Sequence, residues 1–101
     1  MKRDLLSFAD LTRKDADRLF VTAARLKADL RAGRRHQELA GQTLALIFHK
    51  PSLRTRVSFE VAMTQLGGSS IFITDREIGM GSREPVQDVA RVLSGYVDGI
   101  M

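Results

Sequence analysis

The sequence predicts an α/β fold in which a parallel sheet is flanked by helices. Two short apolar runs, residues 42–48 and 70–73, have the length and composition of buried strands. Each run is followed, directly or after a polar segment, by apolar residues that recur at helical spacing. Because strands and helices alternate along the chain, we expect a parallel, right-handed α/β unit preceded by one leading helix.

The leading helix is expected over residues 13–32. Thr12 and Asp15 match a capping box, with Asp in place of the preferred Glu, and Gly33 is suited to the helix C-terminus. The apolar residues that fall on one helical face are Ala16, Leu19, Phe20, Ala23, Leu26 and Leu30. Residues 34–41 are mostly polar and are expected to connect this helix to the first strand.

A second helix is expected over residues 54–66, after the first strand and a short loop. Its apolar residues, which recur at helical spacing, are Val57, Val61, Ala62 and Leu66. Gly67 and Gly68 are suited to end this helix, because glycine adopts the backbone conformations that tight turns require. The second strand at 70–73 then follows.

Residues 74–84 are expected to form an exposed loop, because they combine charged side chains with glycines, and loops of this length are often functional. Pro85 fits the first position of a third helix. The apolar residues of that helix are Val86, Val89, Ala90, Leu93 and Val97. Residues 98–101 are expected to begin a third strand.

The segment 52–56, Ser-Leu-Arg-Thr-Arg, lies where the first loop enters the second helix. The first N–H groups of a helix have no intrahelical partner, and the positive end of the helix dipole attracts anions. Hydroxyls and guanidiniums add further donors that match a phosphate. We therefore predict a phosphate-like ligand here. The alternative is that Ser52 only caps the helix and the arginines are solvated, although cations at this end are unfavourable without an anion.

The composition excludes several classes of function. The chain has 101 residues and no cysteine, which excludes disulfides and cysteine-based zinc sites and fits a cytoplasmic protein. No apolar run approaches the length of a membrane span. His36 and His49 lie far apart without a cluster of carboxylates, so no metal site is expected.

The net charge of +4 raises the question of nucleic-acid binding. Basic residues gather toward the end of the leading helix, where they complement the helix dipole, at Arg25, Lys27, Arg31, Arg34 and Arg35. No aromatic side chains interleave with them, as a base-stacking surface requires. Nucleic acid is therefore not expected among the partners.

Two long segments, 50–68 and 77–101, resemble the ornithine carbamoyltransferases. The first reads KPSLRTRVSFEVAMTQLGG, and its S-x-R-T-R matches the carbamoyl phosphate signature of the aspartate/ornithine carbamoyltransferase family. The second contains R-E-P-V-x-D-V-A-R-V-L, which favours the ornithine branch. The resemblance implies that residues 1–101 are the N-terminal part of the carbamoyl phosphate-binding domain. It also implies that the amino-acid-binding domain is absent from this chain, so we interpret the chain as a fragment.

The activity implied by this resemblance is carbamoyl transfer from carbamoyl phosphate to the δ-amino group of L-ornithine, giving citrulline and phosphate in arginine metabolism. The resemblance implies no metal or organic cofactor and a homotrimer. Ornithine is inferred as the acceptor only from the resemblance to the ornithine branch of the family. A transferase for aspartate, putrescine or an acylated ornithine is one alternative, and a non-catalytic, anion-binding fragment is another.

The resemblance also implies roles for the residues of the signature. The residues expected to bind carbamoyl phosphate are Ser52, Leu53, Arg54 and Thr55. Arg54 is expected to be catalytic, by following negative charge onto the leaving group. Arg56 is expected either to bind the ligand or to brace the loop. Leu53 stands where threonine is common, but its backbone N–H can donate regardless of the side chain.

In the family, the loop equivalent to 74–84 reaches toward a neighbouring subunit's active site, and the glutamine that many relatives place there falls near Gly79. Arg83 or a backbone N–H is expected to replace that contact, unless the loop has no ligand role. His49 stands where most relatives have an acid, and we expect a local packing or hydrogen-bonding variation. Lys50 is expected to be solvated rather than to neutralise phosphate.

Overall fold

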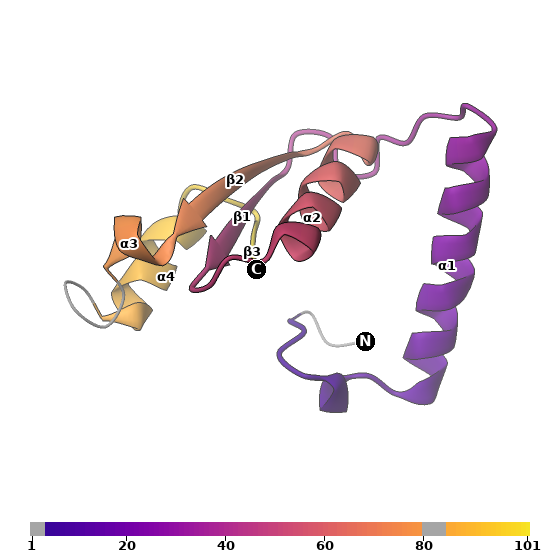
Figure 1. The fold of residues 1–101 in the computed structure, drawn as a ribbon. Coiled ribbons are helices and arrows are strands. Elements are labelled where there is room, and N and C mark those ends of the chain that lie inside the picture. The colour runs from indigo at the N-terminus through magenta and orange to yellow at the C-terminus, as the bar shows by residue number, and fades with distance from the viewer. Residues whose placement is uncertain (1–3, 80–84) are drawn as a thin grey trace. The chain divides into compact units, whose positions relative to one another are not determined.

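The computed structural model describes residues 4–79 and 85–101 (Figure 1). The chain forms two compact units, Met1–Arg35 and His36–Met101. Within the described residues, none of the helices is long and apolar enough to cross a membrane.

The first unit consists of a short 3-10 helix, Phe8–Asp10, and the long helix α1, Arg13–Arg31. The predicted capping box is present. The Asp15 N–H donates to Thr12 Oγ1 at 3.1 Å, and the Thr12 N–H donates to Asp15 Oδ2 at 3.0 Å. Hydrogen bonding to the backbone and side chain of Thr12 lowers the pKa of Asp15. Gly33 follows the helix with φ 78°, a left-handed conformation that favours glycine.

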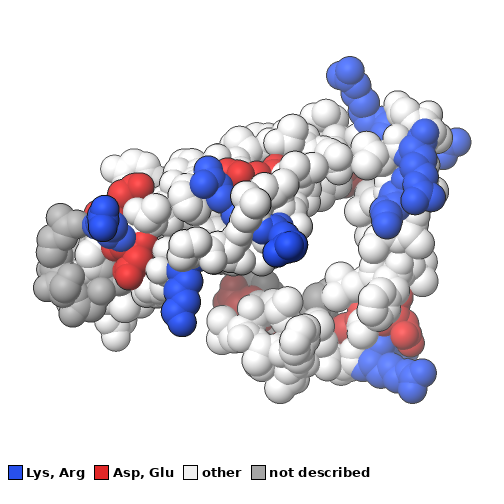
Figure 2. Space-filling view, in the orientation of Figure 1, with Lys and Arg blue, Asp and Glu red and all other residues white. Residues whose placement is uncertain are grey.

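Lys and Arg side chains gather over the C-terminal half of α1 (Figure 2). Arg34 Nη1 forms an ion pair with Asp29 Oδ1 at 3.0 Å. Cations at this end of a helix interact favourably with the exposed carbonyl groups of the last turn. The favourable interaction with the helix dipole and this ion pair are structural reasons for basic residues at this end of α1.

The second unit contains a parallel sheet of three strands in the order β2-β1-β3. Its strands are β1 (Thr43–Phe48), β2 (Ser69–Thr74) and β3 (Gly99–Ile100). On the central strand, Ala45 and Leu46 are completely buried. This burial explains why the sequence of β1 is continuously apolar rather than alternating. The three predicted strands are confirmed, and the α/β fold class with them.

Two helices form the crossovers between these strands. Helix α2, Leu53–Gln65, contacts β1 and β2, and helix α4, Val86–Ser94, contacts β3. The two connections run in opposite directions across the sheet, so right-handed crossovers place the helices on opposite faces. Each helix buries one apolar side chain, Met63 in α2 and Val89 in α4.

The prediction of a continuous loop over 74–84 is wrong for its first part. Asp75–Ile78 form a single helical turn, α3. The Glu77 N–H donates to the Thr74 hydroxyl at 3.3 Å, which caps the turn, and Gly79 ends it with φ 64°. Residues 80–84, including Arg83, lie outside the described residues.

Helix α4 also differs slightly from its prediction. Pro85 is its N-cap residue with extended backbone, so the helix begins one residue later, at Val86. Val97 lies beyond its end, although the Val97 N–H still donates to the Leu93 carbonyl at 2.9 Å. Shifts of one or two residues at helix ends are usual, because terminal turns lack part of their hydrogen bonding.

Candidate anion-binding site

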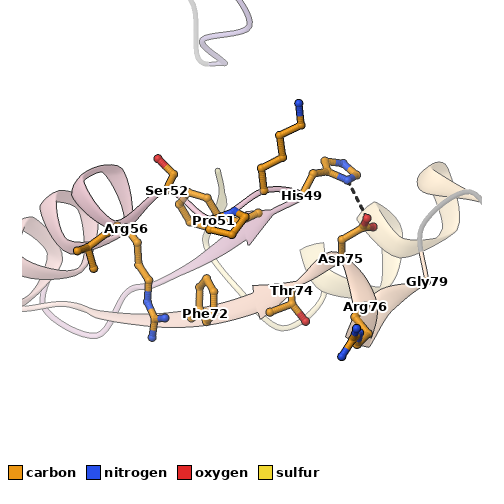
Figure 3. A pocket seen from close by; sticks show the side chains of 12 residues that line it. His49, Pro51, Ser52, Arg56, Phe72, Thr74, Asp75, Arg76 and Gly79 are labelled. Atoms are coloured by element: carbon orange, nitrogen blue, oxygen red, sulfur yellow. Dashed lines mark ion pairs between the residues drawn. The ribbon is translucent and has the colours of Figure 1, made fainter.

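A pocket of about 870 Å³ lies where β1 and β2 end and α2 begins (Figure 3). The described residues that line it are Phe48, His49, Lys50, Pro51, Ser52, Leu53, Arg56, Phe72, Thr74, Asp75, Arg76 and Gly79. Parallel sheets commonly bind ligands outside the carboxyl ends of their strands, because loops and helix N-termini converge there. The pocket therefore occupies the position at which this fold class usually binds ligands.

The N-terminus of α2 opens at this pocket. The first intrahelical bond joins the Arg56 N–H to the Ser52 carbonyl at 3.0 Å, so the N–H groups of residues 53–55 precede the helical ladder. Ser52 occupies the N-cap position, but its side chain makes no cap hydrogen bond. Ser52 is thus the N-cap residue, as the alternative expected, but its hydroxyl is not used to cap the helix. Its exposed hydroxyl and the helix dipole both favour an anion at this point.

The two arginines of the signature have different surroundings. Arg56 is half-buried, with its Cζ 3.6 Å from the ring centroid of Phe72 and its Nε 3.3 Å from Glu60 Oε2. Arg54 is exposed and is not among the residues that line the pocket. Positions two residues apart on a helix lie about 200° apart, so the two side chains leave α2 in different directions. Two roles were expected of Arg56, which were to bind the ligand or to brace the loop, and its contacts fit the second.

The signature residues thus divide between the pocket and the surface beside it. Ser52 and Leu53 line the pocket, whereas Thr55 is an exposed residue of the first turn of α2. Gly79 also lines the pocket, but its N–H donates to the Asp75 carbonyl at 2.8 Å. Its left-handed conformation disfavours the side chain that relatives are expected to carry near this position. Arg83 lies outside the described residues.

The end of β2 supplies residues that sequence reasoning missed. Thr74, Asp75 and Arg76 line the pocket opposite the loop that follows β1. His49 and Asp75 point toward one another in Figure 3, and His49 Nδ1 lies 3.1 Å from Asp75 Oδ2. The polar contact expected of His49 is therefore present. The signal that could have found its partner is positional, because His49 directly follows the predicted first strand and Asp75 comes two residues after the predicted second strand.

The charges around the pocket are mostly positive. Among the described residues, the lining contains the cations Lys50, Arg56 and Arg76 and one carboxylate, that of Asp75. Lys50 is exposed, as expected, but it also belongs to the lining. Within the described residues, no three His, Cys, Asp or Glu side chains are grouped so that they could hold a metal ion. The chemistry that this lining favours is the binding of a small anion.

A parallel α/β unit with a cationic pocket over a helix N-terminus defines the chain as an anion-binding α/β domain. Its residues 3–101 match the profile of the family described as "Aspartate/ornithine carbamoyltransferase, carbamoyl-P binding domain". The chain therefore belongs to the aspartate/ornithine carbamoyltransferase family, and the part of the family that it represents is the carbamoyl phosphate-binding domain. The resemblance drawn from the signature is confirmed.

Individual relatives agree with this assignment. The chain is 50% identical over 101 residues to the ornithine carbamoyltransferase of Syntrophotalea carbinolica, covering 100% of this chain and 33% of that protein. The structure of ornithine carbamoyltransferase from Pyrococcus furiosus aligns with a TM-score of 0.94 and 46% identity, over 98% of this chain and 32% of that one.

A catalytic subunit of M. jannaschii aspartate transcarbamoylase also aligns, with a TM-score of 0.86 and 36% identity, over 98% of this chain and 33% of that one. The chain spans about a third of the length of the relatives that it matches.

Proposed function

We propose that this chain supplies the carbamoyl phosphate site of an ornithine carbamoyltransferase, which transfers the carbamoyl group to the δ-amino group of L-ornithine and releases citrulline and phosphate. The observation that carries the proposal is the α2 N-terminus. The first N–H groups of α2 and the Ser52 hydroxyl, which makes no cap hydrogen bond, lie at a cationic pocket. The chain that carries them belongs to the carbamoyl phosphate-binding family.

In this proposal the phosphate group lies against the first turn of α2, where Ser52, Leu53, Arg54 and Thr55 donate hydrogen bonds. The amine attacks the carbamoyl carbon, negative charge grows on the carbonyl oxygen, and the bond to phosphate breaks. Donors already directed at that charge lower the barrier, and each contributes about 3 kcal/mol. Arg54 is exposed at the second position of α2. In the proposal its long side chain turns toward the pocket, so that its planar guanidinium binds the leaving oxygen.

The acceptor, the assembly and the compartment belong to the same proposal. L-ornithine is favoured as acceptor because the Syntrophotalea carbinolica and Pyrococcus furiosus relatives are named for it. A homotrimer is implied by the family resemblance. A cytoplasmic role in arginine metabolism fits a chain with no cysteine. No cofactor is required for this chemistry.

The test measures phosphate release and identifies the carbamoylated product for the protein as its gene encodes it, with ornithine, aspartate, putrescine and N-acetylornithine offered in parallel. We expect carbamoyl transfer to ornithine alone. Transfer to another amine would show that ornithine is the wrong acceptor, but it would leave the proposed carbamoyl phosphate site unchanged. Binding of carbamoyl phosphate without transfer to any amine would support a non-catalytic, anion-binding role instead. The chain of residues 1–101 assayed alone is expected to be inactive, because it spans about a third of its relatives.

A further inference from the structure

The carboxylate of Asp75 is an unexpected feature of a pocket that binds anions. It lies on the lining, its side chain is 42% exposed, and it stands among cations at the open ends of β1 and β2. A dianion in this pocket would be repelled by that carboxylate at close range, in a site that is only partly screened by water. A positive charge held directly beside Asp75 cancels this repulsion at its source.

His49 is placed to carry that charge. In the parallel register of β1 and β2, Phe48 lies opposite Thr74, so the next residue of each chain segment, His49 and Asp75, continues the pairing. Their side chains meet at 3.1 Å, and both residues line the pocket. The position of the pair is therefore set by the register of the sheet rather than by a chance surface contact.

Stabilisation of the fold is not the main effect of this ion pair. The His49 side chain is 63% exposed, and ion pairs between exposed side chains contribute little to stability because water screens them. The same two charges have a larger effect on a bound dianion, because each of them interacts with two ligand charges. The pair thus has its greatest influence on ligand affinity.

We propose that His49 acts on the bound anion through Asp75: the imidazolium cancels the charge of the carboxylate, so anions bind tightly while His49 is protonated and weakly when it is neutral. This inference rests on the proposed phosphate site, and it adds a pH-dependent control to that site. A neutral imidazole still hydrogen-bonds Asp75 but leaves the pair with one net negative charge at the pocket.

The other charged groups near the pair come from three different elements. Lys50 comes from the loop after β1, Arg56 from α2, and Arg76 and Glu77 from α3. Lysine and arginine side chains ordinarily titrate above pH 10 and carboxylates below pH 5. Histidine is the side chain whose charge ordinarily changes between pH 5 and 8, and His49 is the one histidine among the described residues that line the pocket.

The experiment measures sulfate binding by calorimetry at pH 5.5, 7 and 8.5, in the protein as its gene encodes it. Sulfate is used because it stays a dianion over this range, whereas phosphate changes its own charge. We expect the affinity of the unaltered protein to fall about tenfold as the pH rises, the scale expected for one unit charge acting on a nearby dianion. His49→Gln is expected to bind weakly at every pH and to lose this dependence.

Asp75→Asn and the double variant separate charge cancellation from a structural role. Asp75→Asn removes the repelling charge at nearly constant shape, so sulfate should bind about tenfold more tightly than to the unaltered protein at the same pH. The double variant His49→Gln/Asp75→Asn should bind sulfate at all three pH values to within about threefold of the affinity that the unaltered protein has at pH 5.5. If the pair only held the two segments in place, all three variants would weaken sulfate binding, and that result would overturn the proposal.

His36→Gln is the matched control, because His36 Nδ1 forms a similar ion pair with Glu38 Oε1 at 2.6 Å, outside the pocket lining. It should leave sulfate affinity unchanged. If His49→Gln does not fold, judged by its thermal melt, Asp75→Asn alone decides, and unchanged or weaker binding in that variant overturns the proposal. Absence of sulfate binding by the unaltered protein at all three pH values would instead refute the anion site and the proposed function with it.

Discussion

Replacing Arg56 should weaken the fold more than it weakens catalysis. The guanidinium covers the Phe72 ring at 3.6 Å and forms an ion pair with Glu60 at 3.3 Å, and its side chain is 41% exposed. A cation–π contact at a partly exposed site contributes about 0.5–1 kcal/mol. An exposed ion pair one helical turn apart adds about 0.3–0.5 kcal/mol. Arg56→Ala should therefore lower the free energy of unfolding by about 1–1.5 kcal/mol.

Urea unfolding of the chain measures this loss, and double-mutant cycles divide it between the two partners. The cycle with Glu60→Gln should give a coupling of about 0.3–0.5 kcal/mol, and the cycle with Phe72→Leu about 0.5–1 kcal/mol. Arg56→Lys keeps the charge but loses the planar stack, so it should lose about half of the total. A coupling of zero with Phe72 would refute the reasoning, because the bracing role rests on that contact. So would normal stability accompanied by a collapse of kcat.

Three other substitutions test the remaining parts of the structure. Arg54→Lys, at an exposed position, should leave stability unchanged but lower kcat and kcat/KM together by about a hundredfold, and near-normal kcat would remove Arg54 from catalysis. Thr12→Ala should lower the free energy of unfolding by about 1 kcal/mol at pH 7. Because hydrogen bonding to Thr12 lowers the pKa of Asp15 in the folded state, the stability that Asp15 contributes is fully present above about pH 5 and is lost as the pH falls through that folded-state pKa. In Thr12→Ala the free energy of unfolding, measured with urea at several pH values, should therefore decrease less steeply toward acid pH. Gly68→Ala should cost about 1–3 kcal/mol, because its Cβ would meet a buried side chain at 2.7 Å and backbone oxygens at 3.0 Å, whereas Gly95→Ala, whose nearest contact is 3.5 Å, should change stability little in the same assay.

The features that sequence reasoning predicted well are local ones. The capping box of Thr12 and Asp15 depends on residues three positions apart, and the structure forms both of its hydrogen bonds. The continuous apolar run of β1 reports burial on both faces of the sheet, and its central residues are completely buried. The start of α2 at the S-x-R-T-R segment was predicted to within one residue, because its signals are also local: a loop, a polar signature and an apolar repeat follow one another there.

The single turn of α3 shows where local patterns compete. Its sequence carries a helix start at Thr74 with Glu77 at the third position, and a helix end at Gly79. These signals were outweighed by the charged, glycine-containing character of the whole segment, which is typical of loops. A helix of one turn has no apolar repeat, so periodicity cannot reveal it.

The contacts of the pocket depend instead on the order and register of the strands. His49 and Asp75 are 26 residues apart, as are Phe48 and Thr74, and the parallel register of β1 and β2 brings both pairs together. The same register places Phe72 where Arg56 can cover its ring. A linear sequence shows which side chains follow each strand, but it does not show which strands are neighbours. The ligand-binding signature could therefore be predicted from its own residues, whereas the charge pair that faces it required the assembled sheet.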